Sequence, residues 1–312
     1  MNIYNNISEF PKDKESCVTI GTFDGVHSGH RKILDRLITG AKQNKLESTL
    51  LTFFPHPRMV LQQDTGLKLI DTIKEKKMIL AETGLDNLII HPFSKDFSRL
   101  TAQEYVKDVL VDELNTKQVI IGYDHRFGRN RTADINDLEK YGEQYNFTVD
   151  KISKQEIDDV AISSTKIRES LGSGDIQQAN RYLKRPFFMT GTIVRGYGRG
   201  KGFGFPTANL GIEEDYKLIP NDGVYVSSSI IDGHHCYGLT NIGTNPTVNG
   251  TKRSIETNFL NLDQDLYEKE LSISLLYKIR GEKKFDNVEL LKQAMQNDKK
   301  EALAFIKSNE KS

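Results

Sequence analysis

The sequence predicts an α/β protein with two domains: a parallel-sheet domain over residues 1–184 and a small antiparallel β-barrel with terminal helices over residues 185–312. Three observations predict this fold class. The chain of 312 residues is long enough for two domains that each bury a core. Its first half alternates strand-like and helix-like segments, which indicates a parallel sheet. Its second half contains short strand-like runs at close intervals, which is typical of a closed barrel.

The elements of the first half follow from the spacing of the apolar residues. Strands are expected at residues 17–20, 48–54, 87–92 and 118–122, and helices at about 33–41, 71–83 and 135–145. A further helix begins after Thr101, because Thr101 and Glu104 have the spacing of a capping box. Ligands bind at the carboxyl ends of the strands in a parallel sheet, so the loops there are the first candidates for a site.

The second half begins after a short helix, 176–184, that leads to Arg185 and Pro186. We therefore place the domain boundary between residues 184 and 185. The strands expected beyond it are 191–196, 224–231, 235–242, 255–260 and 271–279. Two helices, 288–296 and 299–306, are expected to follow them.

Composition narrows the classes of function. The chain has 43 Lys and Arg residues and 43 Asp and Glu residues, and this balance argues against a general nucleic-acid binder. Cys17 and Cys236 are too few for a disulfide framework, which fits a reducing cytosol. The first residues lack the pattern of a signal peptide, and no apolar run approaches the ~20 residues of a membrane span. We expect a cytoplasmic protein with neither a membrane nor a nucleic acid as partner.

Residues 21–30, Gly-Thr-Phe-Asp-Gly-Val-His-Ser-Gly-His, join the first expected strand to a helix. Gly21, Gly25 and Gly29 let the backbone approach a ligand at the positive end of that helix, where free N–H groups favour phosphate. His27 and His30 can donate hydrogen bonds to phosphoryl oxygens and stabilise charge that grows on them. Two other interpretations stay open at this point. The segment is also compatible with a glycine-rich turn whose histidines are incidental, or with a metal site that needs further ligands.

Three further loops are predicted at the same edge of the sheet. Residues 54–58, Phe-Pro-His-Pro-Arg, follow the second strand, and residues 122–129, Gly-Tyr-Asp-His-Arg-Phe-Gly-Arg, follow the fourth. Residues 162–168, Ile-Ser-Ser-Thr-Lys-Ile-Arg, place hydroxyl groups and cations at a helix start, which suits a triphosphate or only a helix cap. His56 between two prolines is more typical of a rigid turn than of a catalytic residue. The cations of the second loop, Arg126, Arg129 and Arg131, also fit a solvated basic loop.

The second domain has its own motif at residues 196–209, Gly-Tyr-Gly-Arg-Gly-Lys-Gly-Phe-Gly-Phe-Pro-Thr-Ala-Asn. Its alternating glycines allow close backbone approach, and Arg199 and Lys201 offer positive charge to a polyphosphate. The spacing is that of neither a Walker loop nor a dinucleotide fingerprint. A flexible RNA-contacting segment is the other interpretation, but Thr207 and Asn209 follow directly in a rigid turn that bears two oxygen donors.

The first motif and residues 162–168 resemble the HxGH nucleotidyltransferases, whose domain is Rossmann-like. Taken with residues 196–209 and with Glu256 in an expected strand, nearly the whole chain resembles the bifunctional riboflavin kinase/FAD synthetases of bacteria. The resemblance implies an FMN adenylyltransferase domain at 1–184, which transfers AMP from ATP to FMN and releases pyrophosphate. It implies a riboflavin kinase domain at 185–312, which transfers the γ-phosphoryl group of ATP to riboflavin. Mg²⁺ is the implied cofactor, and riboflavin, FMN and ATP are the implied substrates.

The resemblance also implies a role for each candidate residue. His27 and His30 are expected to stabilise the transferring group, and Glu256 is expected to take the proton from the 5′-hydroxyl of riboflavin. The implied metal ligands are Thr207 and Asn209. The implied nucleotide-binding residues are Gly21, Phe23, Gly25, Gly29, Ser164, Thr165, Lys166, Arg168, Gly198, Gly200, Lys201 and Gly202. The implied flavin-binding residues are Pro55, His56, Pro57, Asp124, Phe127 and Arg280.

Two alternative functions keep part of this interpretation. In one, the first domain is a nucleotidyltransferase for another phosphorylated vitamin or sugar, and the barrel is a separate module. In the other, the chain is a flavin-binding or RNA-binding regulator without turnover, although its neutral net charge argues against RNA.

Overall fold

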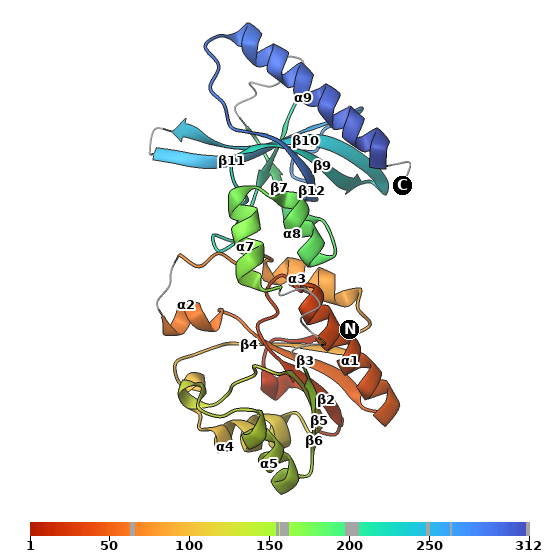
Figure 1. The fold of residues 1–312 in the computed structure, drawn as a ribbon, viewed down its shortest axis with the longest axis vertical. Coiled ribbons are helices and arrows are strands. Elements are labelled where there is room, and N and C mark those ends of the chain that lie inside the picture. Colours follow the sequence, from red (N-terminus) through yellow and green to blue (C-terminus); the bar gives the residue numbers. More distant parts are fainter. Residues whose placement is uncertain are drawn as a thin grey trace. The chain divides into compact units, whose positions relative to one another are not determined.

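The structure is a computed structural model that describes residues 1–62, 66–153, 156, 162–196, 206–247, 250–262 and 264–309. The chain divides into two compact units, Met1–Ser164 and Thr165–Ser312 (Figure 1). No helix among these described residues is long and apolar enough to span a membrane. Gly198, Gly200, Lys201 and Gly202, four of the predicted nucleotide-binding residues, lie outside the described residues.

The first unit contains a six-stranded sheet in the order β1-β4-β3-β2-β5-β6. Every neighbouring pair of its strands is parallel, which confirms the predicted fold class. The strands are β1 Asn2–Tyr4, β2 Ser16–Ile20, β3 Glu47–Phe53, β4 Asn87–His91, β5 Thr116–Gly122 and β6 Thr148–Ile152. The two edge strands, β1 and β6, were not predicted, because they are short and neither contains an apolar run.

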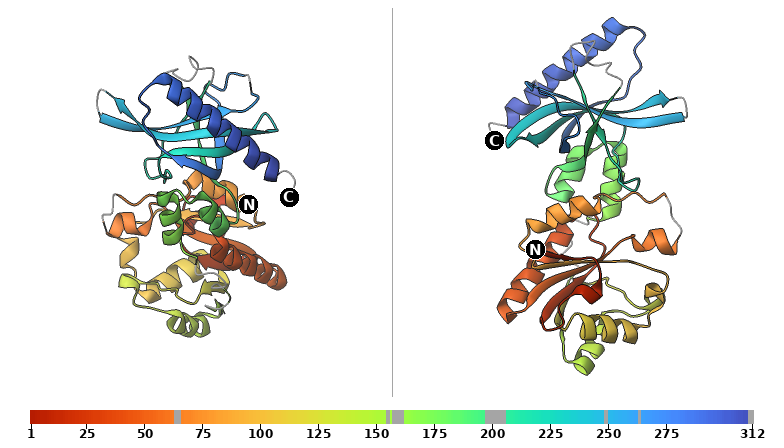
Figure 2. Two further views of the ribbon diagram at one scale, coloured as in Figure 1. Left: turned by 45° about the horizontal axis from the view of Figure 1, so that its top comes forward. Right: turned by 180° about the vertical axis from the view of Figure 1, so that it is seen from behind.

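Helices cover both faces of this sheet (Figures 1 and 2). The helices are α1 Ser28–Asn44, α2 Pro57–Leu61, α3 Ile73–Ala81, α4 Ala102–Glu104, the π-helix η3 Tyr105–Glu113 and α5 Ile135–Tyr145. Short 3₁₀ turns lie at η1 Ile7–Glu9, η2 Phe97–Arg99 and η4 Arg129–Arg131. Side chains of η3 and α5 share one core cluster with β2, β3, β4 and β5. The predicted capping box of Thr101 and Glu104 is present, and it starts the short helix α4.

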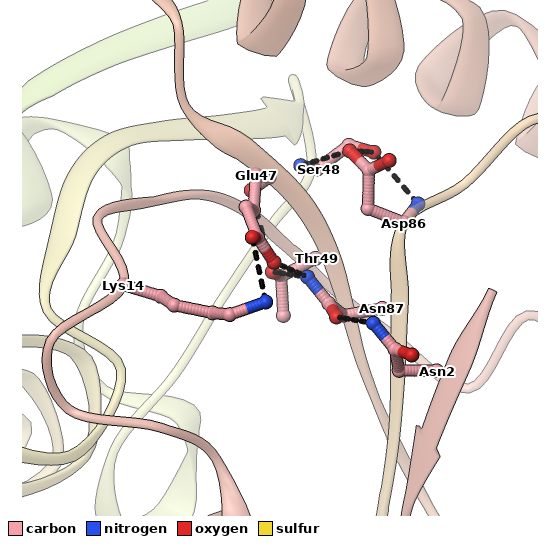
Figure 3. A network of polar contacts seen from close by, with 7 residues as sticks. All are labelled: Asn2, Lys14, Glu47, Ser48, Thr49, Asp86 and Asn87. Carbon is pink, nitrogen blue, oxygen red and sulfur yellow. Dashed lines mark hydrogen bonds and ion pairs between the residues drawn. The ribbon is translucent and has the colours of Figure 1, made fainter.

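The amino ends of three neighbouring strands are joined by polar side chains (Figure 3). The amide of Asn87 donates to Glu47 (2.8 Å) and accepts from Asn2 (3.1 Å), and Lys14 pairs with Glu47 (2.7 Å). Asp86 accepts from both the backbone N–H (2.9 Å) and the hydroxyl (2.7 Å) of Ser48. These contacts satisfy polar groups at the amino ends of the strands, and the candidate loops lie at the opposite, carboxyl ends.

The second unit is a closed antiparallel barrel in the order β10-β11-β8-β7-β12-β9, with β9 paired to β10. This confirms the predicted barrel. Its strands are β7 Phe187–Val194, β8 Ala208–Gly211, β9 Gly223–Ile231, β10 His234–Thr247, β11 Gly250–Phe259 and β12 Glu270–Gly281. Two helices precede them, α7 Ser164–Ser173 and α8 Ile176–Leu183. The predicted boundary between residues 184 and 185 lies directly after α8. That this boundary separates the two enzymatic domains stays a prediction.

Helix α8 is attached to the barrel by the side chain of Asn180. Its amide donates to the Leu275 carbonyl (2.9 Å) on β12, and its oxygen accepts from the Phe187 N–H (2.7 Å) on β7. This explains why α8, which precedes residue 185, falls in the same compact unit as the barrel.

The end of the chain differs from the prediction. One continuous helix, α9 Val288–Asn309, replaces the two helices expected at 288–296 and 299–306. The break was expected around Asn297 and Asp298, residue types with low helix propensity. Asp298 is buried and accepts three hydrogen bonds from Arg280 of β12. This tertiary contact outweighs the local propensity and keeps the helix continuous.

Candidate active sites

The loop that follows β2 is compressed into an unusual backbone conformation. Phe23 (φ 45°), Gly25 (φ 89°) and Val26 (φ 40°) are all left-handed. Left-handed backbone is costly for Phe and for a β-branched residue such as Val, and it persists only where the surrounding structure imposes it. The loop ends at His27, whose Nδ1 accepts a hydrogen bond from the His30 N–H (3.4 Å) and so caps α1. The predicted phosphate-binding turn is therefore a shaped loop at a helix amino terminus.

The structure brings the two predicted histidines together. Their rings stack with centroids 3.7 Å apart, and Phe23 stacks on His30 at 4.6 Å. Burial lowers the pKa of His27 to about 4. The pKa of His30 is also lowered by burial, and then by His27 and by Lys76. Both rings are thus neutral at pH 7. Because Nδ1 of His27 accepts a hydrogen bond, its proton lies on Nε2, where it can be donated to a ligand.

Four groups from four segments hold this loop. The Thr22 carbonyl accepts from Nζ of Lys76 (2.6 Å) and from Oγ1 of Thr52 (3.2 Å). The Asp24 carboxylate accepts from the Ile70 N–H (2.9 Å), and the Asp24 carbonyl accepts from Oγ of Ser164 (2.8 Å). Sequence reasoning selected Ser164 as a phosphate ligand and missed Lys76 and Thr52. Nothing in the charged run around Lys76 indicates that one lysine of that run is buried.

The burial of His27 predicts that the first unit loses stability in mild acid. In the unfolded chain a histidine takes up a proton near pH 6.5, whereas folded His27 does so near pH 4. The unfolded state therefore binds more protons between these values, and the free energy of unfolding falls as the pH falls from about 6.5 to 4. One such group contributes roughly 3 kcal/mol over this range. Replacing His27 by Asn should flatten the pH dependence of amide protection in β2, measured by hydrogen exchange between pH 7 and pH 5.

The matched control for this prediction is His234→Asn, which removes an exposed histidine from the other unit. It should leave the pH dependence of β2 protection as it is in the unmodified protein. An unchanged pH dependence in the His27 variant would mean that His27 titrates normally.

The loop after β3 is fixed as a turn. Pro57 is the first residue of α2, and His56 caps that helix by accepting the Arg58 N–H at Nδ1 (3.1 Å). This contact supports the interpretation of His56 as a rigid turn residue and occupies one ring nitrogen. The flavin-binding role of Pro55, His56 and Pro57 stays a prediction.

The loop after β5 contributes to a cavity of about 510 Å³. Arg129 lines it together with Lys95 and Arg99, and Nε of Arg129 donates to the Arg99 carbonyl (2.8 Å). Phe127 is buried and its ring lies 5.9 Å from that of Tyr105, whereas Asp124 is exposed. The basic loop therefore places one of its three arginines at a cavity. The flavin-binding roles of Asp124 and Phe127 stay predictions.

The predicted phosphate-binding segment forms the first turns of α7. Thr165 and Lys166 are exposed and Arg168 is half-buried. The three residues belong to the second unit, while Ser164 belongs to the first. Their contact with pyrophosphate stays a prediction.

In the barrel, three predicted residues lie together. Glu256 of β11 pairs with Asn209 of β8 in the sheet register. Its carboxylate accepts a hydrogen bond from Ser254 (3.1 Å) and a longer one from Thr207 (3.5 Å). Thr207 and Asn209 line a cavity of about 640 Å³. A Cβ on Gly196 would lie 2.2 Å from the Asn209 amide, so any larger residue there would displace the Asn209 side chain. Ser254, which sequence reasoning missed, lies two residues before Glu256 on the same strand.

Comparisons with known proteins identify the families to which the two parts of the chain belong. The FAD synthetase family matches residues 9–166, and the riboflavin kinase family matches residues 183–306. The chain belongs to the bifunctional riboflavin kinase/FMN adenylyltransferases. A protein of this name from Escherichia coli (strain K12) is 35% identical over 97% of this chain and 96% of its own length. Another, from Buchnera aphidicola subsp. Schizaphis graminum, is 35% identical over 96% of each chain.

A solved structure covers both units. A crystal structure described as a macrolide-efflux protein from Streptococcus pneumoniae is 30% identical, with a TM-score of 0.86 over 96% of this chain and 97% of its own. The two family matches and the named relatives confirm the predicted bifunctional enzyme: this chain is a riboflavin kinase and FMN adenylyltransferase. The two alternative functions are set aside.

In this enzyme Arg280 is held by an acidic partner. Its Nε (3.0 Å) and a terminal nitrogen (2.8 Å) both donate to the Asp298 carboxylate of α9, and its other terminal nitrogen donates to the Gly281 carbonyl (3.1 Å). The Asp298 side chain is only 8% exposed. Arg280 thus links β12 to α9 through this ion pair. The predicted flavin-binding role of Arg280 stays a prediction. Asp298 was missed because its partner is 18 residues away on a barrel strand.

Proposed function

We propose that the enzyme makes FAD from riboflavin in two steps, the first in the barrel and the second at the β2–α1 loop. The observation that supports this division is that each unit holds a separate set of groups suited to one step. A carboxylate and two neutral oxygens lie together in the barrel, and a pair of neutral imidazoles lies at the amino terminus of α1 in the other unit. The two free cysteines, Cys17 and Cys236, support a cytoplasmic location.

In the kinase step, Glu256 accepts the proton of the riboflavin 5′-hydroxyl as its oxygen attacks the γ-phosphorus of ATP. ADP leaves, and FMN is formed. The hydrogen bonds from Ser254 and Thr207 fix the direction of the carboxylate. Positioning and charge stabilisation are the main contributions of a protein to phosphoryl transfer.

In the adenylylation step, a phosphate oxygen of FMN attacks the α-phosphorus of ATP, and pyrophosphate leaves. His27 and His30 donate hydrogen bonds to the oxygens on which charge accumulates, and the amino terminus of α1 adds a favourable dipole. Neutral imidazoles suit this role, because each ring still carries one N–H that can donate a hydrogen bond. No covalent intermediate with the enzyme is needed.

The barrel site fits a magnesium ion that is held mainly by the nucleotide. Thr207 and Asn209 offer neutral oxygens, a weak pair for an ion alone but suitable for Mg²⁺ that keeps phosphate and water ligands. Among the described residues no cluster of three or more His, Cys, Asp or Glu side chains could hold a metal by itself. When bound, the ion would neutralise phosphate charge.

Removing the metal or Asn209 should impair the kinase step. ATP binding to the barrel is expected to weaken in EDTA, and Asn209→Ala should lower riboflavin phosphorylation while FMN adenylylation is retained. Asn297→Ala, an exposed substitution on α9, is the matched control and should behave as the unmodified enzyme. Tight Mg²⁺ binding by the nucleotide-free protein in calorimetry would contradict a nucleotide-held ion.

The assignment of two successive reactions is tested by incubating the enzyme with ATP and one flavin at a time. The products are separated by chromatography. Riboflavin should give FMN and then FAD, and FMN should give FAD directly. In a variant without the adenylylation site, FMN should accumulate from riboflavin and no FAD should form. Failure of FMN to accumulate in that variant would disprove the proposed order.

A further inference from the structure

A lysine is buried beneath the histidine loop. Lys76 of α3 is 3% exposed, and its Nζ donates to the Thr22 carbonyl at 2.6 Å. Asp24 and Asp71, each 1% exposed, interact favourably with its charge and partly offset the burial that lowers its pKa. Burying an ammonium group costs free energy unless the group is paired. The buried ammonium of Lys76 therefore needs the partners that this loop supplies.

The contact fixes the most strained part of the loop. The Thr22 carbonyl belongs to the same peptide plane as the Phe23 N–H, so holding the carbonyl sets the rotation that gives Phe23 its φ of 45°. A left-handed non-glycine residue costs on the order of 1–3 kcal/mol, and it persists because its surroundings hold it. Phe23 in turn stacks on the His30 ring at 4.6 Å. A chain of contacts therefore runs from Lys76 through Thr22 and Phe23 to His30.

Only one other side chain is seen to hold the same carbonyl among the described residues. Thr52 of β3 donates to it at 3.2 Å, a longer contact from an uncharged hydroxyl. The charged contact of Lys76 is the shorter and stronger of the two. Lys76 lies 54 residues from Thr22 in the sequence, so its hydrogen bond joins α3 to the loop.

We propose that Lys76 is a positioning residue for FMN adenylylation: it holds the Thr22 carbonyl, and through Phe23 it sets the His30 ring in the geometry that ATP requires. In this proposal Lys76 acts through the loop and not by direct contact with the substrate. This inference rests on the proposed role of His30 in the adenylylation step, and it assigns a function to a side chain outside the histidine motif.

The test uses Lys76→Met in the full-length enzyme, because methionine keeps much of the length of lysine without its charge. We expect the single-turnover rate of FMN adenylylation at saturating substrates to fall roughly 10²-fold, the loss that a small misplacement of a catalytic group produces. Riboflavin phosphorylation by the same protein should be unchanged and provides an internal control. Lys77→Met, a change at the adjacent lysine, should leave both rates unchanged.

A double-mutant cycle distinguishes positioning from a merely structural role. If Lys76 acts through His30, Lys76→Met should cost little more in a His30→Ala background, because the group it positions is already gone. Equal losses in both backgrounds would overturn the inference. If His30→Ala alone left adenylylation unchanged, the proposed role of His30 would fail instead, so the two failures can be told apart.

Loss of amide protection in β2 would reveal that Lys76→Met does not fold. A second variant keeps the inference testable in that case. Thr52→Val removes the other donor to the Thr22 carbonyl and keeps the shape of the buried side chain. It should slow adenylylation a few-fold and, like Lys76→Met, lose this effect in the His30→Ala background. An unchanged rate in Thr52→Val would mean that the Thr22 carbonyl does not control His30.

Discussion

Replacing His27 and His30 together by alanine is expected to abolish the formation of FAD from FMN while leaving riboflavin phosphorylation intact. Each neutral ring donates to charge that develops only in the transition state, and removing one such donor typically costs 10²- to 10³-fold in rate. The two losses together should bring the adenylylation rate below detection. The kinase step survives because Thr207, Asn209 and Glu256 lie in the other unit.

Single-turnover conversion of FMN, followed by chromatography, measures this effect, and riboflavin consumption by the same sample reports the kinase. His234→Ala with His235→Ala provides the control, since both are exposed in the barrel unit and neither reaction should change. FAD synthesis at an undiminished rate in the His27, His30 variant would show that the β2–α1 loop is not the adenylylation site.

Replacing Glu256 by glutamine should reduce riboflavin phosphorylation by roughly 10²- to 10⁴-fold, the range over which a general base contributes. Glutamine keeps the size of the side chain and can still interact with Ser254 and Thr207, but it cannot accept the proton. FMN adenylylation by the same protein should be unaffected. The measurement is single-turnover phosphorylation at saturating riboflavin.

Thermal unfolding of the same variant distinguishes this role from a structural one. A lost buried hydrogen bond would lower barrel stability and weaken riboflavin binding along with turnover. Glu213→Gln, at an exposed position before β9, is the matched control for the change of charge. Full phosphorylation by a normally folded Glu256→Gln protein would remove Glu256 from the mechanism.

Local patterns in the sequence were sufficient for the architecture and for the motifs. The parallel sheet followed from alternating strand and helix segments, and the barrel followed from closely spaced strands. His27 and His30 were found because a glycine turn, a helix start and two histidines occur within ten residues. Thr207 and Asn209 were found because they follow a glycine-rich run. In each case the informative residues are neighbours in the chain, so their geometry is set by local backbone.

Tertiary structure decided what lies around these motifs. Lys76 meets Thr22 across 54 residues, Thr207 meets Glu256 across 49, and Arg280 meets Asp298 across 18. Such contacts depend on strand order and on which helix covers which face, neither of which leaves a periodic pattern in the sequence. The neutral state of His27 is also a tertiary property, because burial and not residue type lowers its pKa. The continuity of α9 has the same origin, since the partner of Asp298 is on a barrel strand.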